Sequence, residues 1–290
     1  MKVLQINKFF YEESGVTRYL FGVKELLDSS GHDSLEFAMA HPKNVASPCS
    51  PYFVDYIDYN QPGGLFSKIK IGLRLIYSFS ARRKLEKLIL ATKPDIAHLH
   101  VIYHQLTPSI LGVLKKHKIP IVQTLHDYKQ ICPNYLLYVN GRICERCKKH
   151  RYYNVFFHRC IKKSFIRSLN GLVETYLHWF LRSYSQIDLY LAPSQFIRKK
   201  YIEFGVSPEK IKYLPHFLNL EEYNLAGSTG NYLAYVGRLS QEKGVSLILT
   251  ALVKAGSDIP LKIIGDGPEK DNLRAMIKKL GLKKSRIDWF

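Results

Sequence analysis

The sequence lacks long apolar runs, is poor in acidic residues and has only five cysteines. Without an apolar run of about 18 residues, no membrane-spanning helix is predicted. The short apolar stretch at the start is followed directly by acids, which is unlike a secretory signal, and we expect a cytoplasmic protein. Acids number 24 against 43 Lys and Arg, so the net charge is +19 and the pI is near 9.6. Such a charge favours polyanionic partners, which include nucleic acid, anionic lipid head groups and phosphorylated substrates.

The remaining composition is that of a globular protein. The chain has 290 residues, 46% of them hydrophobic and 23% charged, and this length suffices for two domains. Short apolar stretches alternate with stretches in which apolar residues recur at helical spacing, and this alternation predicts an α/β fold with a parallel sheet. Strands are expected at 2–6, 34–40, 95–101, 119–127 and 186–194, and helices at 15–32, 65–91, 106–118 and 195–205.

A break in this alternation predicts a domain boundary. Residues 215–230 are rich in Pro, Gly, Ser and Asn, and strands and helices alternate again after them. We therefore expect an N-terminal Rossmann-like domain over 1–214, a linker over 215–230 and a C-terminal Rossmann-like domain over 231–290. The second domain is expected to be incomplete, because doubly wound domains usually have about a hundred residues or more.

Two glycine-containing loops follow predicted strands of the second domain. In "YVGRLSQEKGVSLIL" the strand ends at Gly237, and Arg238 and Lys243 precede a predicted helix. In "IIGDGPEKDNL" the strand ends at Gly265 and Gly267 before the next helix. Either loop alone is also consistent with an ordinary turn, but the succession favours a phosphate-bearing ligand. Glycines allow a close approach, and helix N-termini and cations attract anions.

These two loops resemble the donor-binding half of the GT-B glycosyltransferases of family 4, also called glycosyl transferases group 1. The N-terminal half is similar to that family in "PDIAHLHVIYHQLTPSIL" and "TLHDYKQICP", and it has Ser14-Gly15 where the family usually has two glycines. The resemblance implies two Rossmann-like domains and transfer of a sugar from a nucleotide-sugar donor, a UDP- or GDP-sugar. It implies a glycan or lipid-linked acceptor, as in the synthesis of surface polysaccharides.

The resemblance also implies roles for individual residues. Arg238 and Lys243 would bind the donor diphosphate together with Gly237, Gly265 and Gly267. His126 would face the transferred sugar, and His100 and the Ser14–Gly15 loop would lie on the acceptor side. A retaining reaction would proceed without a protein nucleophile or a catalytic cofactor, because fixed cations and helix N-termini neutralise the leaving diphosphate.

One element of the family pattern is missing from the sequence. Family members carry a Glu-x7-Glu motif further downstream, whereas no two glutamates here are eight positions apart. The predicted diphosphate contacts are therefore present, and the expected sugar and ribose contacts are absent. We expect a C-terminally truncated transferase whose activity is impaired.

Four of the five cysteines lie within residues 131–160, and the resemblance implies that this segment is an insertion, because similar cysteine insertions occur in some members of that family. Cys144 and Cys147 have the spacing of a metal-binding knuckle, and Cys132 and Cys160 complete a set of four thiolates. His150 and His158 are alternative fourth ligands. Nine basic residues in and next to this segment, against the single acid Glu145, would balance the charge of such a site. The segment predicts a structural zinc ion; an iron–sulfur cluster and free thiols are the alternatives.

The segment 66–89 mixes apolar and basic residues at helical spacing. A basic amphipathic helix can bind an anionic membrane, so peripheral contact with the inner face of the cytoplasmic membrane is predicted. A solvated helix packed on the sheet is the alternative. Two other functions stay open, a non-catalytic module that binds an acceptor or a partner and a basic zinc protein that binds nucleic acid. No helix-turn-helix or repeated finger spacing supports the latter, and no nucleic-acid partner is expected.

Overall fold

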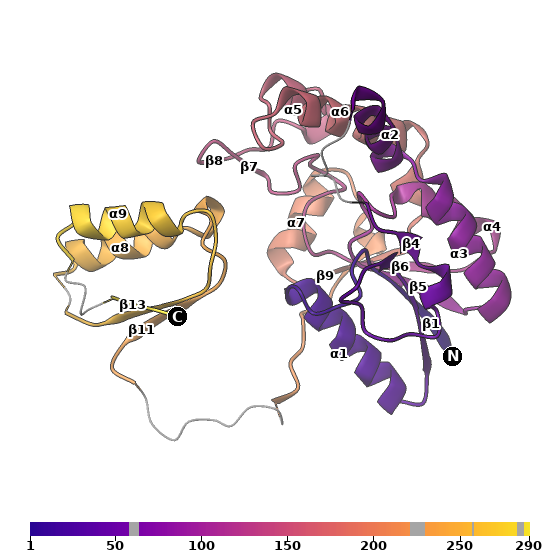
Figure 1. Cartoon of the computed structure of the whole chain (residues 1–290), viewed down its shortest axis with the longest axis horizontal. Coiled ribbons are helices and arrows are strands. Elements are labelled where there is room, and N and C mark those ends of the chain that lie inside the picture. Colours follow the sequence, from indigo (N-terminus) through magenta and orange to yellow (C-terminus); the bar gives the residue numbers. More distant parts are fainter. Residues whose placement is uncertain (58–63, 221–229, 257, 283–286) are drawn as a thin grey trace. The chain divides into compact units, whose positions relative to one another are not determined.

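The computed structural model describes residues 1–57, 64–220, 230–256, 258–282 and 287–290 (Figure 1). Most of the predicted linker therefore lies outside the described residues. The chain divides into two compact units. Unit 1 comprises Met1–Leu137 and Cys144–Asn219, and unit 2 comprises Tyr138–Ile143 and Leu220–Phe290. Within the described residues, no helix is long and apolar enough to cross a lipid bilayer.

Unit 1 contains a parallel sheet in which strand order is not sequence order. The order is β10-β9-β6-β5-β1-β2. The strands are β1 (Lys2–Ile6), β2 (Asp33–Phe37), β5 (Ile96–Leu99), β6 (Ile121–Thr124), β9 (Leu189–Ala192) and β10 (Ile211–Tyr213). Shorter pairings are formed by β3 (Met39–Ala40) with β4 (Val54–Asp55) and by β7 (Tyr138–Val139) with β8 (Arg142–Ile143). The carboxyl ends of β1, β5 and β6 are neighbours, which is where ligands bind in such sheets.

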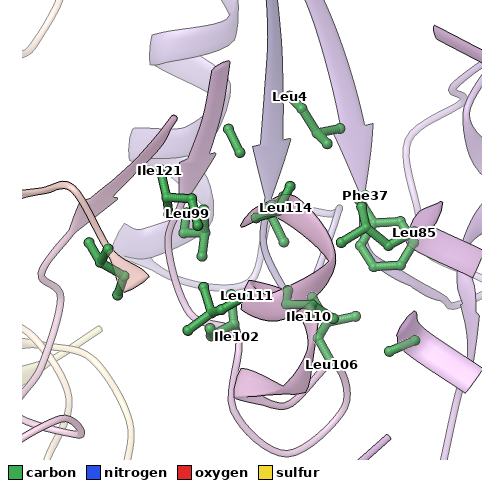
Figure 2. Packing of buried hydrophobic residues seen from close by; sticks show 14 of the residues in the cluster. Leu4, Phe37, Leu85, Leu99, Ile102, Leu106, Ile110, Leu111, Leu114 and Ile121 are labelled. Carbon is green, nitrogen blue, oxygen red and sulfur yellow. The ribbon is translucent and has the colours of Figure 1, made fainter. Parts of the chain in front are cut away.

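Helices connect the strands of unit 1. They are α1 (Gly15–Ser29), α2 (Leu65–Ile76), α3 (Phe79–Thr92), α4 (Leu111–Lys116), α5 (Asn154–Phe157), α6 (Phe165–Phe180) and α7 (Gln195–Glu203). The core lies between sheet and helices. Figure 2 shows Leu4, Leu99 and Ile121 from the strands with Leu111 and Leu114 of α4, all of them fully buried. Continuous burial of such apolar residues is typical of a parallel sheet covered by helices.

Unit 2 has its own small sheet and core. Its parallel strands are β11 (Leu233–Val236), β12 (Leu261–Ile264) and β13 (Ile287–Trp289), in that order. The helices α8 (Val245–Lys254) and α9 (Lys270–Lys279) connect them. Leu249, Ile263 and Leu273 are buried among the apolar residues that join the helices to the sheet.

The structure corrects three sequence-based expectations. The helix expected over 65–91 is two helices, because Tyr77 and Ser78 have extended backbone angles and Ser78 caps α3. The helix expected over 106–118 begins with a 3-10 turn at Pro108–Ile110, so the α-helix itself is only Leu111–Lys116. The strand expected over 34–40 ends at Phe37 as β2, and Met39–Ala40 pairs with β4 in a separate sheet. Helix α6 and strand β10 are not among the elements expected from the sequence.

Candidate active site

A cluster of histidines lies at the carboxyl ends of the central strands of unit 1. His98 is in β5, His100 follows it, and His126 follows β6. Because β5 and β6 pair in parallel, their histidines meet, and the His100 and His126 rings have centroids 5.3 Å apart. The His216 ring stacks on the His126 ring at 5.2 Å. His98, His100, His126 and His216 are called the histidine cluster below.

Hydrogen bonds fix the arrangement of these rings. His100 Nε2 lies 2.9 Å from the Oε1 of Gln5, and His100 Nδ1 lies 3.1 Å from His126 Nε2. With the Gln5 oxygen as acceptor, His100 donates through Nε2, and its Nδ1 accepts the Nε2–H of His126. His126 Nδ1 is then unprotonated. It can accept a hydrogen bond from a hydroxyl group, such as that of a sugar.

Burial keeps the histidine cluster neutral. It lowers the pKa of His98 to about 4 and, with help from the nearby imidazoles, the pKa of His126 to about 3. The pKa of His100 falls well below its usual value for the same reasons. His100 is almost fully buried, whereas His126 is partly exposed. Of these two neutral histidines, His126 is therefore the more accessible to solvent at this edge of the sheet.

Helix α1 covers the histidine cluster with an aromatic side chain. The Tyr19 ring lies 4.2 Å from that of His216, 5.7 Å from that of His126 and 5.9 Å from that of His100. Ser14 and Gly15 form the start of the same helix, where the Thr17 hydroxyl accepts the backbone N–H of Ser14 at 3.1 Å. A Cβ on Gly15 would meet no atom within 4 Å, so packing does not demand glycine there.

A second polar group at the same edge of the sheet is not predicted by the sequence pattern. Tyr103 donates its hydroxyl to the Asp127 carboxylate, and Asp127 also accepts the backbone N–H of Lys129 at 2.9 Å. The Lys8 ammonium lies 4.9 Å from the centroid of the Tyr103 ring. Burial lowers the pKa of Lys8, and Asp127 opposes this shift. Asp127 follows His126 directly, but Tyr103 and Lys8 are distant from it in sequence, so only the fold brings these three side chains together.

In unit 2 the two glycine loops pack on each other. A Cβ on Gly265 would lie 2.1 Å from the carbonyl oxygen of Gly237, and one on Gly267 would lie 2.3 Å from that of Leu239. The Leu239 N–H donates to the Asp266 carbonyl at 2.9 Å. Gly237 and Gly265 also have φ of 152° and 142°, which favour glycine. Loop packing thus explains these glycines, while their predicted contact with a diphosphate stays a prediction.

Arg238 and Lys243 lie on the first of these loops, between β11 and α8. Both side chains are exposed, and neither forms a salt bridge with a described residue. The 3-10 turn Gln241–Lys243 and Gly244, with φ of 68°, lead into α8. The loop thus presents two cations beside a helix N-terminus, and this combination attracts anions.

The cysteines of the predicted zinc site lie in unit 1. Cys132 and Cys147 are buried, Cys144 and Cys160 are partly exposed, and all four are free thiols. Burial raises the pKa of Cys147, and so does the nearness of the other three thiols; burial raises the pKa of Cys160 to about 11. Among the described residues, however, no three His, Cys, Asp or Glu side chains are arranged as ligands of one ion. The zinc ion therefore stays a prediction.

A cavity of about 750 Å³ lies elsewhere in unit 1. Its lining includes Lys129, Glu174, His178 and Trp179, and no member of the histidine cluster. The cavity is therefore separate from the predicted catalytic residues.

Comparison with known proteins supports the interpretation of both halves of the chain. Residues 14–222 match the family described as Glycosyltransferase Family 4, and residues 219–287 match Glycosyl transferases group 1. An uncharacterized 42.6 kDa protein in the cps region of Klebsiella pneumoniae is 28% identical over 180 residues, which are 61% of this chain and 42% of that protein.

A second relative comes from Campylobacter jejuni. It is N-acetylgalactosamine-N,N'-diacetylbacillosaminyl-diphospho-undecaprenol 4-alpha-N-acetylgalactosaminyltransferase, 30% identical over 123 residues, which are 40% of this chain and 33% of that enzyme. The chain thus spans less than half the length of these two relatives.

Solved structures with a similar fold cover the whole chain. The lipopolysaccharide outer core galactosyltransferase WaaB has a TM-score of 0.57 at 17% identity, with 100% of this chain and 68% of WaaB covered. Anabaena Alr3699/HepE, solved in complex with UDP and glucose, has a TM-score of 0.59 at 16% identity, with 100% and 69% covered. At such low identity these structures show the fold alone, and they confirm the predicted GT-B class. Because the family match over residues 14–222 extends over more than half of the sequence, this chain belongs to Glycosyltransferase Family 4.

Proposed function

We propose that this protein transfers a sugar, with retention of configuration, from a UDP- or GDP-sugar to a glycan or lipid-linked acceptor in surface polysaccharide synthesis. The observation that carries the proposal is the loop of unit 2 in which Arg238 and Lys243 are exposed without a described salt-bridge partner. A diphosphate would supply the missing anion, and two cations beside the N-terminus of α8 would neutralise it as it leaves.

The acceptor and donor classes are supported by the relatives. The name of the Campylobacter jejuni relative specifies a diphospho-undecaprenol acceptor, and Anabaena Alr3699/HepE was solved with UDP and glucose. The other relative is described as a protein of the cps region. Each is similar to this chain, so a lipid-linked acceptor and a nucleotide-sugar donor are the substrate classes to test first.

In this proposal His126 is the residue that contacts the transferred sugar. Because its pKa is lowered to about 3, the imidazole is neutral at physiological pH. A neutral ring does not repel the positive charge that develops on the sugar, and its unprotonated Nδ1 can accept a sugar hydroxyl. The leaving diphosphate then takes the proton of the acceptor hydroxyl, so no metal ion or other cofactor is needed for the transfer.

Titration with UDP and GDP, followed by calorimetry, tests the donor site. The Arg238→Ala/Lys243→Ala double variant is expected to bind the preferred nucleotide more weakly. Each of the two lost cations should weaken binding about 10- to 100-fold, because hydrogen bonds to charged groups contribute about 1.5–3 kcal/mol each. Lys278→Ala/Lys279→Ala removes the same charge from the last turn of α9 and should bind normally. Equal affinity of both double variants, or no nucleotide binding by the natural protein, would contradict the proposal.

A further inference from the structure

Helix α6 is amphipathic, but its polar side is buried and its apolar side is exposed. Its buried side carries Ser168, Gly171, Glu174 and His178 rather than large apolar residues. Glu174 pairs with the buried Lys129 at 2.8 Å, and His178 Nε2 donates to the carbonyl oxygen of Ile76 at 2.8 Å. These polar contacts fix which side of α6 faces the protein, because breaking a buried ion pair is strongly destabilising.

The opposite side of α6 is apolar and exposed. Ile166, Leu169, Val173 and Phe180 recur at helical spacing, and Ile166 and Phe180 are 78% and 79% exposed. Side chains of this size normally point into a core, where burial stabilises the fold. An aligned row of them on the outside marks a surface that binds a partner.

Two neighbouring helices extend this surface. The side chain of Asn170 in α6 donates to the carbonyl oxygen of Gly72 in α2 at 3.1 Å, and the rings of Phe156 in α5 and Phe165 in α6 lie 4.3 Å apart. Figure 1 shows α2, α5 and α6 together at one end of unit 1. Leu73 of α2 and Phe157 of α5 are 63% and 73% exposed. The exposed apolar residues of α6, with Leu73 and Phe157, are called the α6 face below.

Cations border the α6 face at the N-terminus of α6. Arg159, Lys162, Lys163 and Arg167 are exposed and form no salt bridge with any described acid. Arg159 lies 5.9 Å from the centroid of the Phe165 ring. Glu174 is the only acid between Arg146 and Arg182, and it is buried. Four cations at the positive end of a helix repel one another, and an anionic surface would relieve this repulsion.

We propose that the α6 face docks on an anionic lipid bilayer, with its apolar side chains in the interfacial region and its cations on the lipid phosphates. Charge complementarity favours this occupant. A second copy of the chain would bring the same cations against one another, and the exposed apolar row is poorly suited to nucleic acid. Amphipathic helices with such a composition lie in the plane of the membrane interface.

The docking site differs from the one expected from the sequence. The segment 66–89 was predicted to bind the membrane, yet its second half, α3, buries Ala81, Leu85, Leu88 and Ile89 in the core. In this proposal the membrane-binding helix is α6, and α2 lies beside it. The docking proposal rests on the proposed function in one respect, which is that docking would give the protein access to a lipid-linked acceptor.

Vesicle sedimentation tests the proposal on the full chain. We expect the protein to sediment with vesicles of phosphatidylglycerol and phosphatidylcholine, and much less with vesicles of phosphatidylcholine alone. The Ile166→Ser/Phe180→Ser variant should bind the anionic vesicles at least about tenfold more weakly, since each side chain buries apolar area in the interface. Leu26→Ser/Leu90→Ser, which changes exposed side chains of α1 and α3, should bind as the natural protein does.

A second pair of variants separates local from overall charge. Lys162→Glu/Lys163→Glu and Lys87→Glu/Lys199→Glu lower the net charge equally, and all four lysines are exposed. We expect the first variant to lose roughly tenfold or more in vesicle affinity and the second to lose far less, because a cation acts only close to the membrane. Equal losses in the two variants, or normal binding by the α6-face variants, would overturn the proposal. So would a dimer that the Ile166→Ser/Phe180→Ser change dissociates.

Tryptophan fluorescence gives an independent readout. The chain has two tryptophans, and Trp179 lies at the end of α6 while Trp289 lies in unit 2. In a Trp289→Phe background, anionic vesicles should shift the Trp179 emission to shorter wavelength, and an unchanged emission at saturating lipid would contradict docking through α6. The measurement needs no donor, so docking can succeed where nucleotide binding fails, and the reverse.

Discussion

At the residue scale, the neutral state of the histidine cluster links its burial to pH. In the folded chain burial lowers the pKa of His98 to about 4, whereas an unfolded histidine titrates near its usual value of 6.5. Between these values the unfolded chain binds a proton that the folded chain does not bind. Stability contributed by neutral His98 is therefore complete above about pH 6.5 and is lost as the pH falls towards 4.

We predict that His98→Gln makes the free energy of unfolding less dependent on pH. Acidification below about pH 6.5 should cost the natural protein about 1.4 kcal/mol more per pH unit than it costs the variant. The amide can still donate to the Thr124 hydroxyl, which lies 2.8 Å from His98 Nε2. Urea unfolding at about pH 7 and about pH 5, followed by Trp179 fluorescence in a Trp289→Phe background, measures the difference. Parallel pH profiles would show that His98 is not a neutral residue in the folded state.

The sequence predicted some members of the candidate site because they lie in short motifs at strand ends. His126 closes a predicted strand, and His100 alternates with His98 along another, so both could be assigned to the edge where ligands bind. Tyr19 and His216 could not be assigned in this way. They reach the cluster from α1 and from the segment after β10, and their contact depends on strand order, which the sequence pattern does not specify.

At the scale of elements, periodicity predicted the parallel strands β1, β5, β6 and β9 but neither β10 nor α6. Strands β1, β5, β6 and β9 are short apolar stretches between polar ones, a pattern with one simple interpretation. In α6 the apolar residues also recur at helical spacing, but they lie outside while Glu174 and His178 are inside. Periodicity reports which residues share a face and not which face is buried.

The cysteine segment carries a prediction at this scale. Burial raises the pKa of Cys147 and of Cys160, and the neighbouring thiols raise both further. Binding of one zinc ion by the thiolates would offset this cost and draw the four sulfur atoms into a tetrahedron. We therefore expect about one zinc ion per purified chain by elemental analysis. The Cys144→Ser/Cys147→Ser variant should lose this zinc and unfold at lower temperature.

The fifth cysteine provides the matched control. Cys49 is buried in the core of unit 1 and is not one of the four predicted zinc ligands. The Cys49→Ser variant should therefore keep its zinc, even where the substitution lowers the free energy of unfolding. A natural protein purified without zinc, or equal zinc in the three proteins, would leave the segment as a set of reduced thiols.

At the scale of the whole molecule, each unit has its own hydrophobic core, and none of the described residues belongs to both cores. The alternation of strands and helices predicted two Rossmann-like parts from the sequence. The exact residues of each unit could not be predicted, because the hairpin β7–β8 is separated in sequence from the rest of unit 2. A hairpin's place depends on its tertiary contacts, and local periodicity does not report those.

Separate cores predict separate unfolding. The core of unit 2 is built from fewer buried residues than that of unit 1, and small cores contribute less net stability. In a Trp179→Phe background only Trp289 of unit 2 fluoresces, and in a Trp289→Phe background only Trp179 of unit 1 does. We expect the urea midpoint reported by Trp289 to be lower than the midpoint reported by Trp179. Leu249→Ala should lower the free energy of unfolding of unit 2 by about 2–5 kcal/mol, because Leu249 is buried in the unit 2 core. The midpoint reported by Trp289 should therefore fall, and the midpoint reported by Trp179 should stay unchanged. Coincident midpoints that move together in the variant would instead mean that the chain unfolds as one cooperative body, and the two cores would then not be independent sources of stability.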